Sequence, residues 1–154
     1  MIVMKFGGTS LAGGEGIKNT ASIIKTRLDK KPIIVISAMK GVTDKLLNLA
    51  KISAEGVNPN EKTHSLIEEH KETIKSLNLT EDFLTEDFVN LHDVLNGIYL
   101  LKELSLRSLD LVSSFGEIFS SKIISEYLNK NNLKSKQYSG GEIGILMNNI
   151  QNSE

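Results

Sequence analysis

Cysteine and tryptophan are absent from the 154-residue sequence, and proline occurs only twice. Without cysteine the chain can form no disulfide, no zinc–thiolate site and no thiol nucleophile. No apolar run is long enough to span a membrane, and the apolar start of the sequence is too short for a signal peptide. We therefore expect a cytoplasmic protein rather than a secreted or membrane-spanning one.

Neither sign of charge is in marked excess. The 18 Lys and Arg residues oppose 19 Asp and Glu residues, which gives a formal net charge of −1. Proteins that bind nucleic acid or membrane surfaces through charge carry a basic excess, so we expect neither partner. Hydrophobic residues make up 40% and charged residues 24% of the sequence, a composition typical of a globular domain with its own core.

Two short apolar runs near the start predict parallel strands. Residues 1–6 are mostly apolar up to a pair of glycines, and residues 32–37 are almost continuously apolar and β-branched. Apolar residues at helical spacing predict a helix after each strand, over 17–28 and 42–52. In this order both strand-end loops lie at the carboxyl edge of one sheet, where open α/β sheets bind their ligands.

The rest of the sequence has a mainly helical pattern. We predict a helical insert over about residues 58–104, a long helix over 105–129, and a third parallel strand over 133–138. All three histidines fall in the insert: His64, His70 and His92. The first two are six residues apart and lie on different faces of a helix, so we predict solvated histidines and no metal site.

A glycine-rich loop follows the first strand and reads Lys5-Phe6-Gly7-Gly8-Thr9-Ser10. Glycines at a strand end let the backbone approach a ligand, and successive N–H groups can hold an anion. The hydroxyls of Thr9 and Ser10 add donors, and the Lys5 ammonium is suited to neutralise a transferring phosphoryl group. The alternative is a tight turn with a lysine in solvent. The sequence contains neither a Walker A motif nor a dinucleotide-binding glycine motif.

Two further segments carry residues suited to ligand binding. Residues 37–43 join the second strand to the N-terminus of a helix, and the N–H groups there favour an anion. Thr43 could contact such a ligand, or its hydroxyl could cap the helix. Residues 113–120 lie inside the long helix, where Gly116 costs about 1 kcal/mol relative to alanine and indicates close packing or ligand approach. The neighbouring Glu117 lies among apolar residues and either binds a ligand or faces water.

Taken in order, these segments resemble the aspartokinases of the amino acid kinase superfamily. Four segments carry the resemblance: Lys5-Phe6-Gly7-Gly8-Thr9-Ser10, Ser37-Ala38-Met39 followed by Val42-Thr43, Ser114-Phe115-Gly116-Glu117 with Ser120, and Gly140-Gly141-Glu142 followed by Gly144-Ile145. They cover essentially the whole sequence. The resemblance implies an α/β fold of the amino acid kinase type, a three-layer αβα sandwich with a mainly parallel sheet.

The resemblance also implies a domain organisation. Residues 1–154 correspond to the amino-terminal, amino-acid-binding lobe of the kinase domain, with the helical insert at about 58–104. The nucleotide-binding half, which supplies a catalytic aspartate in the family, and the regulatory ACT domains have no counterpart in these residues. We therefore expect the chain to be part of a longer aspartokinase and to be inactive alone.

For the parent enzyme, the resemblance implies phosphorylation of the side-chain carboxylate of L-aspartate by ATP. The products are ADP and 4-phospho-L-aspartate, and the reaction is the first step of lysine, threonine and methionine biosynthesis. Lys5 is implied as the catalytic residue. The residues implied to bind the ATP phosphates are Lys5, Gly7, Gly8, Thr9, Ser10 and Ser37. Thr43 and Glu117 are implied to bind L-aspartate, with Glu117 near its ammonium group.

The resemblance further implies that Mg²⁺ arrives with ATP and that the parent forms a homodimer or a larger homo-oligomer. Two alternatives stay open at this point. Another amino acid kinase could act on glutamate, acetylglutamate or a nucleoside monophosphate; the form of the first loop and the long helical insert favour aspartokinase. A non-catalytic module could bind an amino acid or an anion; the presence of Lys5, Thr43 and Glu117 favours an enzyme.

Overall fold

The computed structural model describes residues 1–145. Strands β1 (Ile2–Phe6) and β2 (Pro32–Ile36) pair in parallel and form a two-stranded sheet, with Met4 opposite Ile34 at its centre. Helix α1 (Gly13–Lys25) connects the two strands. The parallel pairing that the first two apolar runs predict is therefore confirmed.

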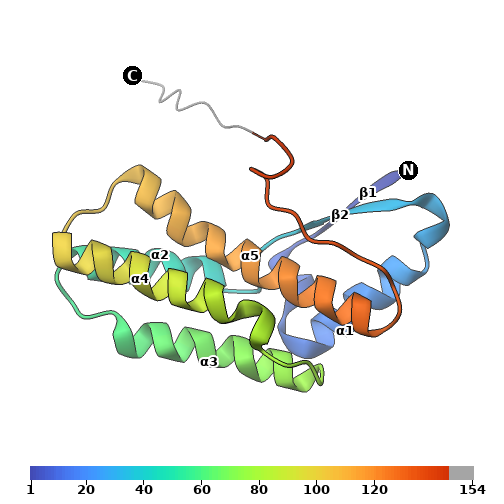
Figure 1. The fold of residues 1–154 in the computed structure, drawn as a ribbon, viewed down its shortest axis with the longest axis horizontal. Helices are drawn as coiled ribbons and strands as arrows, with labels where there is room; N and C mark the ends of the chain where they lie inside the picture. Colours follow the sequence, from blue (N-terminus) through green and yellow to red (C-terminus); the bar gives the residue numbers. More distant parts are fainter. Residues whose placement is uncertain (146–154) are drawn as a thin grey trace.

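Four further α-helices follow: α2 (Val42–Ala54), α3 (Asn60–Ser76), α4 (Thr85–Leu101) and α5 (Leu106–Lys130). Three single-turn 3-10 helices are also present: η1 (Gly8–Leu11), η2 (Leu28–Lys30) and η3 (Asp82–Leu84). Helix α5 packs against α2, α4 and β2, and Figure 1 shows it running from the far end of the helical bundle to the sheet. One helix therefore links the bundle to the strands.

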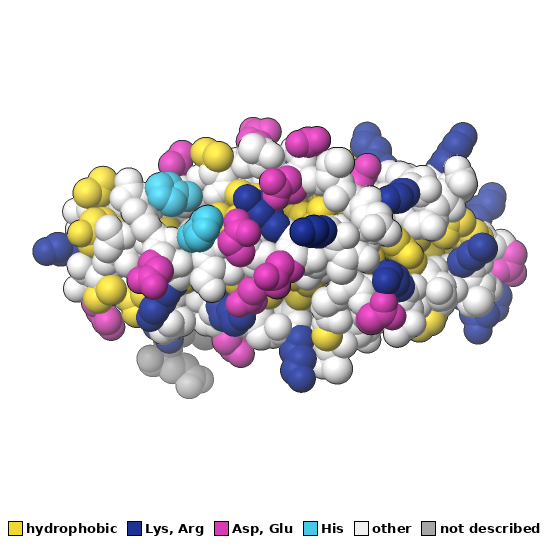
Figure 2. All heavy atoms as spheres, turned by 90° about the horizontal axis from the view of Figure 1, so that it is seen from below, with side chains coloured by type: hydrophobic (Ala, Val, Ile, Leu, Met, Phe, Trp, Pro, Cys, Tyr) yellow, Lys and Arg dark blue, Asp and Glu magenta, His cyan; other side chains and the backbone are white. Residues whose placement is uncertain are grey.

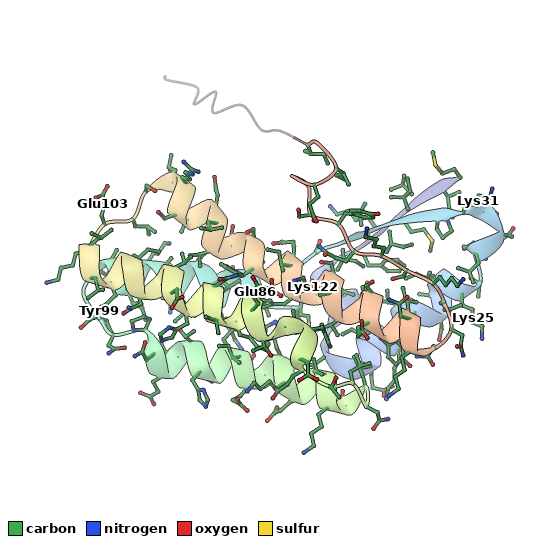
Figure 3. The ribbon with its side chains drawn as sticks, viewed as in Figure 1. Lys25, Lys31, Glu86, Tyr99, Glu103 and Lys122 are labelled. Atoms are coloured by element: carbon green, nitrogen blue, oxygen red, sulfur yellow. The ribbon has the colours of Figure 1, made fainter. Side chains whose placement is uncertain are left out.

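The core is one continuous apolar cluster between the helices and the inner face of the sheet. Its fully buried side chains include Leu11 of η1, Leu84 of η3 and, from the longer helices, Ile17, Leu46, Leu66, Leu91, Leu95, Phe119 and Ile123. Each helix buries one apolar stripe, as the helical spacing in the sequence predicts. A partly buried ion pair of 2.6 Å between Lys122 and Asp87 also joins α5 to α4, and Figure 3 shows Lys122 beside the end of α4 that carries Glu86.

The third strand predicted over residues 133–138 is wrong. The segment runs without strand pairing along the end of α5. The N–H of Leu133 donates to the carbonyl of Leu128 (2.9 Å) and the N–H of Ser135 to Oδ1 of Asn129 (2.8 Å), so both groups bond to α5 rather than to a strand. Half-buried and exposed residues do alternate here. This alternation arises because one side of an extended segment lies against the protein. An extended segment can do so without pairing in a sheet.

The three-layer sandwich is not formed within residues 1–145, which make a mostly helical α/β arrangement. One face of the sheet packs on the core, whereas Val3, Ile33 and Val35 on the other face are 65%, 50% and 43% exposed. Helices α2, α4 and α5 bury their apolar stripes chiefly against one another. The two strands of this narrow sheet are therefore covered on one face only.

The outer surface agrees with the balanced charge of the sequence. Seen from below, the visible face carries side chains of both signs, and basic ones are more frequent toward its right-hand end (Figure 2). Within the described part of the chain, no helix is both long enough and apolar enough to cross a membrane.

The two loops that follow the strands are held together by their backbones. Beyond the strands, the N–H of Ser37 donates to the carbonyl of Phe6 at 3.1 Å and extends the parallel ladder. A Cβ at Gly8 would lie 2.9 Å from the carbonyl oxygen of Ala38 and 3.3 Å from the N of Lys40. Only glycine permits this approach, so one function of Gly8 is to let the two loops pack closely.

His70 contradicts the prediction of solvated histidines, because its side chain is 0% exposed. Its Nδ1 lies 2.8 Å from the carbonyl oxygen of Leu66, and its ring packs edge-on against Phe88 and Phe119, with centroids 6.4 and 5.0 Å away. The buried Nε2 has no hydrogen-bond partner among residues 1–145. Burial lowers the pKa of His70, because desolvation disfavours the imidazolium form. His70 is a neutral core residue.

We expect acid to destabilise the fold through His70. Below the ordinary histidine pKa of about 6.5, unfolded His70 takes up a proton while the folded imidazole, with its lowered pKa, stays neutral. The unfolded state then binds more protons, so the free energy of unfolding falls as the pH falls. Urea unfolding from about pH 7.5 to about pH 5.5 measures this fall, which should be smaller in His70→Leu.

The control is His92→Gln, since the His92 side chain is 46% exposed. This variant should keep the pH dependence of the wild type. The assignment of the acid sensitivity to His70 is wrong if His70→Leu loses stability on acidification as steeply as the wild type does.

Gly8 and Gly7 form a matched pair for testing the contact between the loops. Gly8→Ala should lower the free energy of unfolding by about 1–3 kcal/mol, because its Cβ meets backbone atoms that must move. Gly7→Ala should change it by no more than about 0.5 kcal/mol, because nothing lies within 4 Å of the added Cβ. Urea unfolding of both variants measures the two changes in the free energy of unfolding. Equal losses of stability would contradict the packing role of Gly8.

Candidate functional site

A mainly polar cavity of about 390 Å³ lies at the carboxyl ends of β1 and β2. Three segments far apart in the sequence line it: Gly8 and Thr9 after β1, residues 37–41, 43 and 44 after β2, and Glu117 of α5. This is the edge of the sheet at which the strand order predicts a ligand site. The close packing of the two loops and the passage of α5 beside β2 bring the three segments together.

The loop after β1 is fixed by its own backbone and by α1. The N–H of Ser10 donates to the carbonyl of Gly7 at 2.9 Å, which closes a tight turn. The hydroxyl of Thr20, on α1, donates to the carbonyl of Ser10 at 3.1 Å, and Thr20 is almost fully buried. The loop therefore presents Gly8 and Thr9 to the cavity from a fixed base.

The cavity also contains the start of α2. The N-cap of this helix is Gly41, whose φ of 78° lies in the left-handed region that favours glycine, and no side chain caps the helix. Thr43 is therefore not the cap, and its side chain lines the cavity together with Asp44. The positive end of the helix dipole and the N–H groups of the first turn favour an anion at this place.

Glu117 lies between two cavities. Besides the polar cavity, it lines a larger, mainly apolar one of about 990 Å³ formed by β2, α5 and the segment from Leu133 to Ile145. Glu117 is exposed. It lines the same polar cavity as Gly8 of the first loop.

The structure brings five of the eight candidate residues to the polar cavity: Gly8, Thr9, Ser37, Thr43 and Glu117. Lys5, Gly7 and Ser10 are not among its lining residues. The side chain of Lys5 is exposed, and its strand register places it beside Val35, on the open face of the sheet. Lys5 therefore lies on the open face of the sheet and does not line the cavity.

Sequence reasoning missed two charged residues of the cavity, Lys40 and Asp44. Lys40 lies inside the segment 37–43 that the sequence analysis singles out, and Asp44 directly follows it. Their position between β2 and α2 could have identified both as candidate residues of the site. Within residues 1–145, no group of three or more His, Asp or Glu residues is close enough to hold a metal ion.

Comparison with known proteins places the chain among kinases. Residues 1–153 match the Amino acid kinase family. Chloroplastic aspartokinases 1 and 2 of Arabidopsis thaliana are 39% and 37% identical to it over 148 residues, which are 94% of this chain but 26% and 27% of those proteins. The chain thus spans about a quarter of the length of the curated relatives it matches.

Solved aspartokinases share the fold. Escherichia coli aspartokinase III in complex with aspartate and ADP matches with a TM-score of 0.72 and 25% identity, over 86% of this chain and 29% of that one. The same enzyme in complex with lysine and aspartate matches with a TM-score of 0.71 and 24% identity, over 87% of this chain and 30% of that one. The chain belongs to the amino acid kinase family, and within it is an aspartokinase-like domain that matches only part of the longer aspartokinases.

Proposed function

We propose that this chain forms the L-aspartate-binding part of an aspartokinase, which transfers the γ-phosphoryl group of ATP to the side-chain carboxylate of L-aspartate. The observation that carries the proposal is the convergence of Gly8, Ser37, Thr43 and Glu117 on one polar cavity. The similarity to plant aspartokinases over 94% of the chain supports the same reaction.

The chemistry of the cavity suits an amino acid with an extra carboxylate. L-Aspartate carries two carboxylates and one ammonium group near neutral pH. The first turn of α2, the Thr43 hydroxyl and Lys40 favour a carboxylate, whereas Glu117 is placed to accept hydrogen bonds from the ammonium group. The two acidic residues of the lining, Asp44 and Glu117, disfavour a nucleoside monophosphate, which carries negative charge only on its phosphate and has no ammonium group.

The proposed reaction needs no general base. A side-chain carboxylate oxygen of L-aspartate attacks the γ-phosphorus, the bond from this phosphorus to the bridging oxygen breaks, and ADP leaves with the electron pair. The attacking carboxylate is already ionised at neutral pH, so no proton has to be removed. The protein must instead align two anions and neutralise the repulsion between them.

We assign these tasks to residues of the first two loops. Gly7, Gly8, Thr9, Ser10 and Ser37 bind the ATP phosphates, and Lys5 neutralises the transferring phosphoryl group. Because Lys5 lies on the open face of the sheet and Gly8 and Thr9 line the cavity, the phosphates would lie across the Gly7-Gly8 turn. Mg²⁺ bound with ATP supplies further charge neutralisation to the phosphates.

In this proposal residues 1–154 are the amino-acid-binding lobe, and α3 and α4 lie in the insert at about 58–104. A second half of the kinase domain would cover the open face of the sheet and complete the three-layer sandwich. The parent would act in the cytoplasm as a homodimer or a larger homo-oligomer. The plant relatives are named chloroplastic.

Binding of L-aspartate and succinate to the 154-residue chain tests the substrate site. Glu117→Gln should weaken L-aspartate binding by about 10-fold, because it removes the charge that faces the ammonium group. Succinate has both carboxylates but no ammonium group, so the same substitution should not weaken its binding. Calorimetric titration of wild type and variant with each ligand measures the difference.

Three outcomes would contradict this assignment. A wild-type chain that binds neither ligand has no substrate site of its own. An equal loss for both ligands shows that Glu117 does not face the ammonium group. Tighter binding of glutamate or acetylglutamate than of L-aspartate would favour another amino acid kinase.

A coupled ADP-release assay with L-aspartate tests the phosphoryl transfer. The 154-residue chain should show no turnover, because loss of one transition-state charge partner typically costs about 10²- to 10³-fold and the resemblance assigns several partners to the other half. In an active longer chain that contains these residues, Lys5→Ala should lower turnover by about 10²-fold or more.

Lys25→Ala is the control for the loss of a positive charge, because Lys25 lies in the last turn of α1, away from the first loop (Figure 3). It should keep normal turnover. Substantial turnover by the 154-residue chain would overturn the expectation that it is inactive alone, and indifference to Lys5→Ala would overturn the role of Lys5.

A further inference from the structure

Helix α5 touches the loop after β2 at a glycine. A Cβ at Gly116 would lie 2.7 Å from the Cβ of Ala38, 3.3 Å from Cγ1 of Val42 and 3.4 Å from Cδ1 of Leu46. Gly116 and Ala38 are both buried. No larger residue fits without moving the helix away from the loop, so Gly116 sets how closely α5 approaches the segment that leads from Ser37 into α2.

One turn further along α5, a hydroxyl fixes the same contact. The Oγ of Ser120 donates to the carbonyl of Ser37 at 2.7 Å, and Ser120 is only 1% exposed. The N–H of Ser37 donates to the carbonyl of Phe6 on the opposite side. The backbone of Ser37, which lines the polar cavity, is thereby held between β1 and α5.

A simpler role for Ser120 is an ordinary bond to its own helix. Its Oγ also lies 2.9 Å from the carbonyl of Gly116, and Ser114 and Ser121 bond to their own helix in a similar way. Ser120 differs from these serines because its shortest contact, 2.7 Å, crosses to another element. The two roles make different predictions about the spacing of α5 and the loop.

We propose that Gly116 and Ser120 are positioning residues that lock α5 against the loop after β2 and so set the separation of Glu117 from Ser37 and Thr43. The consequence for ligand binding rests on the proposed function. Glu117 directly follows Gly116 and lines the cavity with Ser37 and Thr43, so a shift of the helix moves one wall of the site. Displacement of a binding group by about 1 Å can cost about 10²-fold in a positioned reaction.

A measurement without ligand tests the positioning itself. The nuclear Overhauser effect between the methyl of Ala38 and the α-protons of Gly116 reports their separation in the 154-residue chain. Ser120→Ala should weaken this effect, because the bond that holds the helix to the loop is lost. Ser121→Ala is the matched control: it removes only the bond to Ile118 in its own helix and should leave the effect unchanged.

Binding of L-aspartate supplies the second measurement. Ser120→Ala should weaken L-aspartate binding by about 3- to 10-fold, whereas Ser121→Ala should not. In the Ser120→Ala background, Glu117→Gln should cost less than it does in the wild type, because Glu117 is already displaced. A role of Ser120 in stability alone would leave the cost of Glu117→Gln unchanged. Gly116→Ala should act in the same direction as Ser120→Ala, provided that the variant folds.

The two measurements separate the positioning from the proposed function. If the wild type binds no L-aspartate, the proposed function fails, and the Overhauser effect still decides whether Ser120 positions α5. An unchanged Overhauser effect in Ser120→Ala overturns the positioning proposal whatever the binding result. A weakened effect together with additive costs of Ser120→Ala and Glu117→Gln overturns its connection to Glu117.

Discussion

The contact of α5 with the loop after β2 is the constraint on which the candidate site depends. Glu117 belongs to the bundle of helices, whereas Ser37 and Thr43 belong to the end of the sheet and the start of α2. The buried contact of Gly116 with Ala38 and the bond from Ser120 to Ser37 join these two parts at the cavity. If the distance between α5 and the loop varied, the wall of the cavity that carries Glu117 would move. A polar site binds its ligand well only when its binding groups hold fixed positions.

The sequence predicts local elements well where the pattern needs no distant partner. Continuous β-branched residues indicate β2, and helical spacing indicates α2 and α5 close to their observed ends. The third strand fails because alternation over 133–138 describes an extended chain with one side buried, whereas a strand also needs a hydrogen-bonding neighbour. In the structure the side chain of Asn129 takes the N–H of Ser135 instead.

His70 shows how residue type can mislead where spacing is informative. Leu66, His70 and Ile74 follow one another at intervals of four residues, and all three are buried on one face of α3. This spacing predicts a core position for His70. The expectation that a histidine lies in solvent led to the opposite prediction. The aromatic rings of Phe88 and Phe119 that enclose the imidazole come from two other helices, so the sequence near His70 gives no sign of them.

The alternation of side chains along a strand explains the position of Lys5. Phe6 is buried beneath the sheet, so the neighbouring Lys5 must point to the opposite, open face. Membership in one motif therefore does not place Lys5 in the same cavity as Gly8. The cavity itself contains Gly8, Thr9 and Ser37, to which the proposal assigns the ATP phosphates, together with Thr43 and Glu117, to which it assigns L-aspartate. In the proposed reaction the two anions therefore meet in one cavity, and Lys5 would have to reach the phosphoryl group from outside the lining of that cavity.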